Sequence, residues 1–519
     1  MSQVESNAAE LRALTEQLEH VASNRALLAA LSVAERTRLL TAAGALYCPD
    51  PTQRRQLLRA RLRREKAERR GRDEARLEDA GIRTLRREKV FTTPNYRTPP
   101  PALGQGSPED HAAQPPEVVE PQNCYVCKRD YTRLHPFYDQ LCPECGDFNL
   151  AKRSELADLR GRVALITGAR VKIGYQAGIK LLRCGAELIV TTRFPRDAAL
   201  RYAAEPDFAE WGHRLQVFGL DLRHTPSVEA FCRHMLTTRS RLDFIINNAC
   251  QTVRRPPDFY RHMLASETAS ERTMPESARR LLGDYEGLRG YSLVDGDDQG
   301  NGHGATLVEA DRHASVAGLI RPAELSQVPL LPEEIGGQAH LFPQGQLDAD
   351  LQQVDLRDRN SWRLLLHEVS SVELLEVQLV NAIAPFVLNA RLKPLLLRTP
   401  GREKHVVNVS AMEGQFYRKF KTTRHPHTNM AKAALNMMTR TSAADYHADG
   451  IHMNAVDTGW VTDEDPAAIA ARKREQHRFH PPLDIVDGAA RIVDPIISGV
   501  NSGVHVWGQF LKDYRPTDW

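Results

Sequence analysis

The spacing of hydrophobic positions changes along this chain. From residue 7 to 46, leucines and valines mostly recur every three or four positions, which predicts amphipathic helices. Ser32 followed by Glu35 is typical of a capping box and predicts the start of a second helix. Beyond Pro51, residues 53 to about 89 are dominated by arginine and glutamate, which predicts a long helix that is exposed or lies on a partner. We therefore expect residues 1–90 to form a helical, Arg-rich N-terminal region.

Residues 91–121 are rich in proline and predict an extended linker. After residue 156 the pattern alternates between short apolar runs and helical segments, which is the signature of a parallel sheet covered by helices. The predicted fold is α/β, with a doubly wound parallel sheet of Rossmann type over 156–519. The helical region and a small zinc-ribbon module are expected to precede it.

That module rests on four cysteines at residues 122–155. Cys124 and Cys127 form one CxxC pair, and Cys142 and Cys145 form another after 14 intervening residues. Two such pairs offer four thiolates to one tetrahedral ion, so the spacing favours structural Zn²⁺ over a redox pair or an iron–sulfur cluster. Four protein ligands close the coordination sphere, which argues against a catalytic metal. Whether the module staples a neighbouring segment or binds a partner stays open.

Composition narrows the class of protein. The chain has 519 residues and a formal net charge of +3, so overall charge does not indicate nucleic-acid binding. The Arg-rich helix leaves open the possibility that it binds a protein or nucleic-acid partner, although a solvent-exposed helix face is the simpler interpretation. No membrane span and no signal peptide are expected. The clustered cysteines suit a reducing compartment, so the expected location is cytoplasmic.

A glycine-bearing turn indicates a dinucleotide site. The apolar strand 162–167 runs into Gly168 and, after Arg170 and Lys172, Gly174 opens a helix. Such a turn lets backbone amides and the positive helix end meet a pyrophosphate. A second strand follows at 187–192 and ends at Arg193, with no acidic residue there to hold ribose hydroxyls. Arginine at that place favours NADP(H) over NAD, because it can bind the 2′-phosphate.

The order of these segments resembles the short-chain dehydrogenase/reductase superfamily. Its TGxxxGxG loop matches at Thr167, Gly168 and Gly174, with Lys172 in place of the second glycine. Further matches are Asp221 after the third strand, the NNA of residues 247–249, and the TG…T segment of residues 458–462. The resemblance implies the following cofactor-binding residues: Thr167, Gly168, Arg170, Lys172, Ile173, Gly174, Arg193, Asp221, Leu222, Asn248, Ala249, Lys432, Gly459 and Thr462.

The catalytic residues of that family are only partly present. Asn381 matches its asparagine and Lys432 its lysine, whereas Ala411 stands at the catalytic serine, one residue after Ser410. Thr428 occupies the tyrosine position, and an aliphatic hydroxyl is too weak an acid to replace a phenol.

Two side chains are candidate replacements for the missing phenol. Tyr417 lies in an insertion before the lysine helix, and His425 stands where the enoyl reductases of the superfamily carry their tyrosine. A surface loop and a turn residue are the plainer interpretations of these two positions.

Residues 251–347 form an insertion relative to the family and are expected to make a lid or a partner surface. Within it, the loop that starts at Asp295 begins like a calcium loop but has Thr306 where the bidentate Glu is needed, so calcium is not expected. Two functions remain. One is an NADP-dependent oxidoreductase with a modified active site, acting on an unknown small molecule. The other is a catalytically inactive NADP(H) sensor or scaffold. The family commonly forms dimers and tetramers, which gives the expected oligomeric states.

Overall fold

The computed structural model describes residues 3–47, 51–94, 116–294, 316–417, 421–477 and 479–519. The chain divides into two units, Met1–Ala75 and Arg76–Trp519. The loop that begins at Asp295 and most of the proline-rich linker lie outside the described residues.

The N-terminal region is helical, as the periodicity predicts. Its elements are α1 (Gln3–Ser23), η1 (Arg25–Ala30), α2 (Val33–Tyr47) and α3 (Pro51–Glu78). The capping box is confirmed, because the Ser32 amide donates to the Glu35 carboxylate at 2.9 Å and the Glu35 amide donates to Ser32 Oγ at 3.3 Å. On α3, Arg61 and Arg64 pair with glutamates one turn further on, at the exposed surface.

The Arg-rich helix is shorter than predicted. It ends at Glu78, and a separate helix α4 (Gly81–Arg87) follows after the extended residue Ala80. The reason is tertiary: the Gly81 and Ile82 amides donate to backbone carbonyls at 136 and 137, and the Ile82 side chain is fully buried. Buried contacts therefore override the helical propensity of the arginines.

The cysteine-containing module is a hairpin followed by a helix: β1 (Glu117–Asn123), β2 (Asp130–Arg133) and α5 (Pro143–Ser154). The two strands pair antiparallel. Strand β1 begins inside the stretch predicted as linker, because Val118 is buried in an apolar cluster that the module shares with Ile82 of α4 and Leu483.

The predicted doubly wound sheet is confirmed. Its strands are β3 (Val163–Thr167), β4 (Glu187–Thr192), β5 (Leu215–Gly219), β6 (Phe244–Asn247), β7 (Lys404–Ser410), β8 (Ile451–Asp457), β9 (Phe510–Lys512) and β10 (Arg515–Thr517). They lie in the order β10-β9-β8-β7-β6-β3-β4-β5, and every pair except β9–β10 is parallel. The strand order reverses beside β3, which is where Rossmann-type sheets open a crevice for ligands.

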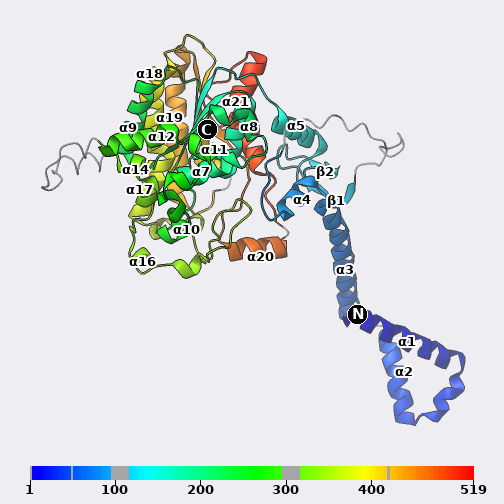
Figure 1. Ribbon diagram of the computed structural model, residues 1–519. Helices are drawn as coiled ribbons and strands as arrows, with labels where there is room; N and C mark the ends of the chain where they lie inside the picture. Colours follow the sequence, from blue (N-terminus) through cyan, green and yellow to red (C-terminus); the bar gives the residue numbers. More distant parts are fainter. Residues whose placement is uncertain (1–2, 48–50, 95–115, 295–315, 418–420, 478) are drawn as a thin grey trace. The chain divides into compact units, whose positions relative to one another are not determined.

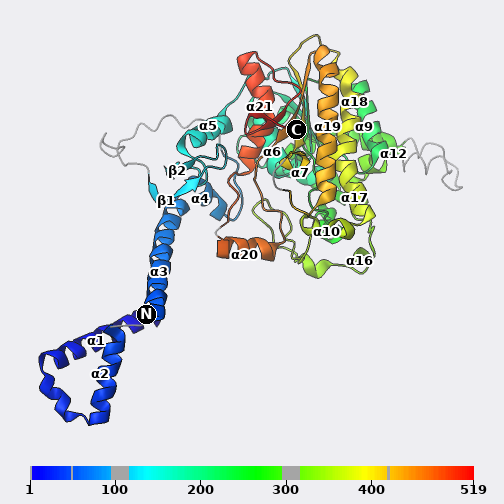
Figure 2. The same cartoon turned by 180° about the vertical axis from the view of Figure 1, so that it is seen from behind.

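Helices cover both faces of the sheet (Figures 1 and 2). One layer holds α6 (Lys172–Arg183) and α21 (Ile485–Ser502), and the other holds α9 (Thr225–Thr238), α18 (Ala384–Leu396) and α19 (Pro426–Ala448). The shorter elements outside the insertion are α7 (Pro195–Ala203), α8 (Phe208–Trp211), η3 (Gly212–Arg214), η6 (Ser361–Arg363), η7 (Leu366–Glu368), α17 (Ser371–Gln378), η8 (Leu379–Ile383), η9 (Met412–Gly414) and α20 (Ala467–His477).

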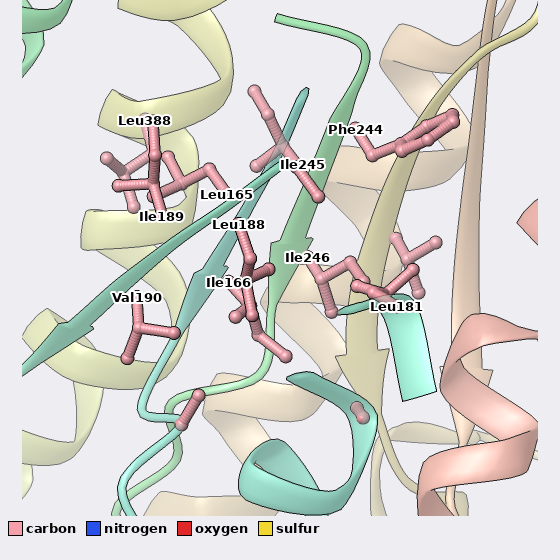
Figure 3. Close-up of a cluster of buried hydrophobic side chains, with 14 of the residues drawn as sticks. Leu165, Ile166, Leu181, Leu188, Ile189, Val190, Phe244, Ile245, Ile246 and Leu388 are labelled. Carbon is pink, nitrogen blue, oxygen red and sulfur yellow. The ribbon is translucent and has the colours of Figure 1, made fainter. Parts of the chain in front are cut away.

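The core lies between these layers. Figure 3 shows Leu165 and Ile166 of β3 between side chains of β4 and β6, with Leu388 of α18 on one side and Leu181 of α6 on the other. These four side chains are at most 1% exposed, and each such burial stabilises the fold by about 1.5–3 kcal/mol. The strands are apolar on both faces, as parallel sheets covered on both sides require.

One helix within the described residues, Ser371–Leu396, is long and apolar enough to cross a membrane by length and composition. Half of its most apolar stretch is buried, and its second half packs on β6 and β7. A core helix passes the same test, so this feature is weak evidence for a span.

The insertion folds into short helices beside the sheet. They are α10 (Pro257–Thr268), η4 (Glu271–Thr273), α11 (Glu276–Arg280), α12 (Gly283–Val294), α14 (Ala317–Ile320), α15 (Pro322–Leu325), α16 (Pro332–Ile335) and η5 (Ala339–Leu341). Phe259, Tyr260 and Met263 of α10 form a buried cluster with Phe194, the residue after Arg193. The insertion thereby packs on the loop that follows β4.

Candidate active site

A pocket of about 1500 Å³ opens at the carboxyl ends of the parallel strands. Residues that follow β3, β4, β5, β6, β7 and β8 line it in turn: Gly168, Arg193, Asp221, Asn248, Ala411 and Gly459. This is the position at which open α/β sheets bind ligands. Except for Thr167, every residue that the resemblance assigns to the cofactor contributes to the pocket wall.

The glycine turn needs its two matching glycines for space. A Cβ on Gly168, which has φ +66°, would lie 2.7 Å from Ala249 Cα. A Cβ on Gly174 would lie 2.3 Å from Asn248 Nδ2, which donates to the carbonyls of Thr167 and Gly168. The asparagine side chain thus holds the turn in place, and both the asparagine and the turn line the pocket.

Lys172 replaces the family's second glycine without changing the backbone conformation that this position demands. Its φ is +56°, in the left-handed region that favours glycine. Burial lowers the pKa of its ammonium, but Glu464, Asp350 and Asp348 outweigh that effect and raise it above its usual range. The Lys172 ammonium donates no hydrogen bond to another described residue, and the lysine side chain lines the pocket beside the glycine turn.

Arg193 lies at the end of β4 against an aromatic surface. It donates to the Tyr260 hydroxyl at 2.8 Å, and its guanidinium lies 4.7 Å from the centroid of that ring. Burial raises the pKa of Tyr260, but Arg193, Arg255 and Arg170 outweigh it, so that the pKa falls below its ordinary value. The net field at this end of the pocket is therefore positive.

Arg170 is less available than the sequence suggested. It forms an ion pair with Asp197 at 2.7 Å and donates to Gln352 at 3.2 Å. Its charge is compensated inside the protein, although the residue still contributes to the pocket wall.

Asp221 is also engaged within the protein. Its carboxylate accepts bidentate hydrogen bonds from Arg223 at 3.0 and 2.6 Å, and its amide donates to Gly318 O at 2.7 Å. Burial alone would raise the pKa of Asp221, but the charge and hydrogen bonds of Arg223 outweigh burial and lower that pKa below its usual value. The carboxyl is therefore charged. Arg223 in turn pairs with Glu376, which lines the pocket.

The two residues that match the family's catalytic set occupy different places. Lys432 lines the pocket and donates from Nζ to Val409 O at 2.7 Å. Asn381 lies behind the wall in the π-helical turn η8, where it accepts from the Gln251 amide at 2.7 Å and donates to the Gln251 carbonyl at 3.2 Å. A π-turn of this kind is often found at functional sites. Asn381 fixes the chain next to Cys250 rather than facing the pocket.

The two candidate proton donors, Tyr417 and His425, and the two hydroxyls at or beside the family's catalytic positions, Thr428 and Ser410, occupy different places. Tyr417 is 85% exposed and lies outside the wall formed by the described residues. Thr428 is buried outside that wall, and its Oγ1 has no partner among the described residues. Ser410 lines the pocket with an equally unpartnered Oγ, as does His425 with an unpartnered Nδ1.

His425 is held rigidly. Its ring stacks on Trp362 with centroids 3.8 Å apart and planes 5° apart, and its backbone is left-handed at φ +43°. Burial lowers the pKa of His425, and the charge of Glu413 opposes that shift only in part. The imidazole is therefore neutral near pH 7.

Two parts of the pocket wall were not anticipated from the sequence. Tyr260 comes from the insertion, and Tyr125 comes from the cysteine module, where its hydroxyl accepts from the Trp460 amide at 3.0 Å. Asp457, in the segment that includes Gly459, also lines the pocket, and burial raises its pKa although Lys512 opposes this. Of these three residues, only Asp457 could have been found from the sequence, because it directly precedes the matched segment of residues 458–462.

The four cysteines of the module converge. Their Sγ atoms all lie within 4.8 Å of one another, and the Cys142 amide donates to Cys124 Sγ at 3.3 Å. The module also contacts the segment after β8: Arg153 pairs with Asp484 at 2.5 Å, and Tyr138 donates to Asp487 at 2.5 Å. These contacts connect the module to the N-terminal end of α21, and Tyr125 connects it to Trp460 in the pocket wall.

Comparison with known proteins agrees with this architecture. Residues 162–271 match the family model described as short chain dehydrogenase, and residues 359–483 match that described as Enoyl-(Acyl carrier protein) reductase. These matches and the strand order support a fold of the short-chain dehydrogenase/reductase superfamily. The unmatched segment between them falls largely in the predicted insertion.

Several relatives share parts of the chain. An uncharacterized protein of Acanthamoeba polyphaga mimivirus is 29% identical over 75% of this chain and 74% of its own length. Dehydrogenase/reductase SDR family member 13 of Bos taurus is 34% identical over 21% of this chain and 30% of its own length. Human retinol dehydrogenase 14 is 40% identical over 18% of this chain and 31% of its own length. The chain therefore spans under a third of the length of these last two relatives. Among solved structures, a Pseudomonas aeruginosa RhlG/NADP complex is 16% identical, with a TM-score of 0.39, over 68% of this chain and 95% of its own.

Proposed function

We propose that this chain is an NADP(H)-dependent oxidoreductase of short-chain dehydrogenase/reductase type, which interconverts an alcohol and a carbonyl compound. The observation that carries the proposal is the pocket at the carboxyl ends of the strands, because the glycine turn, Arg193 and Lys432 line one continuous cavity. The cavity of about 1500 Å³ includes the dinucleotide site, and the insertion borders it without filling it, which supports a substrate site beside the cofactor over a filled, purely sensory one.

The residues present fit a phosphorylated dinucleotide. The turn between Gly168 and Gly174 would hold the pyrophosphate at the N-terminus of α6, and Lys172 would add a direct charge. Arg193 would bind the 2′-phosphate, assisted by the Tyr260 hydroxyl that already contacts it. At the other end, Lys432 would hold the nicotinamide ribose, near Gly459.

When bound, the nicotinamide would accept or supply the hydride. The proton requires another group, and His425 is the candidate with a free nitrogen in the wall. Because its pKa is lowered, the neutral imidazole can accept the hydroxyl proton of an alcohol as hydride leaves the carbon. The products would be the carbonyl compound, NADPH and the imidazolium, which releases its proton to solvent.

The first test is NADPH titration of the purified chain, followed by absorbance of reduced nicotinamide with carbonyl, enoyl and imine substrates. Arg193→Gln removes a charge-assisted hydrogen bond worth about 1.5–3 kcal/mol, so NADPH should bind roughly 10–100-fold more weakly while NADH binding changes little. Arg391→Gln, at an exposed pair with Glu229 on α9, is the matched control. Equal losses for both cofactors would contradict the assignment of Arg193.

The proton-transfer role has its own test. His425→Gln should lower kcat by about 10²–10⁴-fold with NADPH affinity unchanged, and should remove the acidic limb of the pH profile for alcohol oxidation. That limb arises because protonation of His425 below its pKa removes the base. Thr428→Val, outside the wall, should leave kcat within about twofold. If the His425→Gln variant is as active as wild type, another group transfers the proton. Glu413 and Asp457, which also line the pocket, would then be tested.

We further propose that the four cysteines hold one structural Zn²⁺, because four convergent thiolates with an amide donor suit that ion. The ion would cross-link the hairpin to α5 and so fix Tyr125 against Trp460. Metal analysis of the purified chain should give about one zinc per chain. Cys142→Ser should lose it and lower the denaturation midpoint, and metal-free protein with an unchanged midpoint would refute the site.

A further inference from the structure

A second cavity, of about 450 Å³, lies between α4 and α20. Four arginines line it, together with two acidic side chains and His480: Arg83, Arg86, Arg87 and Arg474, with Glu78 and Asp463. The lining of this cavity thus contains two more arginines than carboxylates.

The two acidic side chains already have partners. Glu78 accepts from Arg83 at 2.9 Å and from Arg87 at 3.2 Å. Asp463 pairs with Lys473 of α20 at 3.2 Å. Neither carboxylate is therefore left to neutralise the remaining two arginines.

Those two are Arg86 and Arg474, and no described carboxylate lies within ion-pairing distance of either. Arg86 donates from Nη2 to Leu483 O at 3.0 Å, while its buried Nη1 has no partner among the described residues. Burial lowers the pKa of Arg86 although the charges of Asp139, Asp484 and Asp487 oppose this shift. The surrounding carboxylates therefore do not fully offset its desolvation, and an anion in the cavity would also satisfy the buried Nη1.

The pKa of His480, which also lines this cavity, is affected by the same arginine charges. Burial lowers the pKa of His480, and the charges of Arg83 and Arg86 lower it further, with Asp139 and Glu78 opposing. The cavity floor is also rigid, because α4 is anchored through the buried Ile82 and the Arg83–Asp139 pair at 2.7 Å.

We propose that this cavity binds a phosphate group through Arg86 and Arg474. Guanidinium groups match the geometry of phosphate oxygens and bind them by charge-assisted hydrogen bonds. The cavity shares Asp463, Ala470 and Arg474 with the wall of the large pocket. We infer that the phosphate belongs to a substrate that extends from the large pocket into this cavity; this last step rests on the proposed function.

The test uses the full-length chain, titrated calorimetrically with inorganic phosphate at constant ionic strength, with and without saturating NADPH. Saturation with NADPH fills the phosphate-binding turn, so the remaining binding reports the second cavity. Arg86→Gln and Arg474→Gln should each weaken phosphate binding at least tenfold, and Arg86→Gln, which lies outside the wall of the large pocket, should leave NADPH affinity unchanged. Arg391→Gln is the control. Arg474 is exposed, so its variant remains informative if the Arg86 variant fails to fold.

The outcomes separate the two proposals. Phosphate that binds both arginine variants as tightly as wild type overturns the site, and so does acetate that binds as tightly as phosphate, because the cavity would then select charge alone. NADPH that fails to bind while phosphate still depends on Arg474 overturns the proposed oxidoreductase and leaves the anion site standing.

Discussion

Replacing Lys172 separates two properties that this residue combines, a left-handed backbone and a charge at the phosphate turn. Its φ of +56° costs a residue with a Cβ about 1–2 kcal/mol, a strain that glycine avoids. Glycine loses about 0.5–1 kcal/mol of that advantage through its greater freedom in the unfolded chain. Lys172→Gly should therefore stabilise the backbone by roughly 0.5–1 kcal/mol, partly offset by the lost attraction to Glu464.

Lys172→Ala is the matched comparison, because it loses the same ammonium but keeps the Cβ. The glycine variant should be more stable than the alanine variant by about 0.5–1 kcal/mol in urea unfolding of otherwise identical proteins. Both variants should bind NADPH about 10–100-fold more weakly, since both lose one charge-assisted hydrogen bond to phosphate.

Two results would refute this reasoning. If the alanine variant is as stable as the glycine variant, the left-handed backbone at this position costs no more than the extra freedom that glycine has in the unfolded chain, about 0.5–1 kcal/mol. If either variant binds NADPH as tightly as wild type, the ammonium does not contact a phosphate, and the substitution of the family's glycine has only a structural consequence.

Three further perturbations follow from the contacts. Gly174→Ala places a Cβ 2.3 Å from Asn248 Nδ2, so the turn must shift and NADPH titration should show at least a tenfold loss of affinity. Tyr138→Phe removes a buried hydrogen bond to Asp487, and urea unfolding should show a loss of about 1.5–3 kcal/mol. Burial lowers the pKa of His452 to about 4 from an ordinary value near 6.5, so the unfolded chain binds its proton first. Stability should accordingly fall by about 2 kcal/mol from pH 7 to pH 5, and His452→Gln should remove that part of the dependence in urea titrations at the two pH values.

Some of the site was predictable because its physics is local. The strand, the glycine turn and the helix at 162–183 follow from apolar spacing and from glycine at positions where a Cβ has no room. Cys124 to Cys145 were grouped by their spacing, and their Sγ atoms do converge. Arg193 was placed by its position at the end of a strand and Lys432 by its match to the family's lysine, and both line the pocket.

Other expectations depended on contacts that sequence spacing does not encode. Arg170 was expected to face the cofactor, but Asp197 from the next helix neutralises it. Thr428 and His425 are three residues apart, yet only His425 lines the pocket, because the left-handed backbone at His425 and its stacking on Trp362 direct the ring there.

By itself, the sequence determined the local conformations, the parallel α/β class and the cysteine cluster, because backbone hydrogen bonds and turn sterics act over a few residues. Tertiary structure decided which charges are compensated and which side chains face a cavity. Tyr260 meets Arg193 across 67 positions of the chain, and Arg86 meets Leu483 across 397. Whether an arginine is free to bind a phosphate depends on such distant partners, since a charge is neutralised by whatever the fold brings within a few ångströms of it.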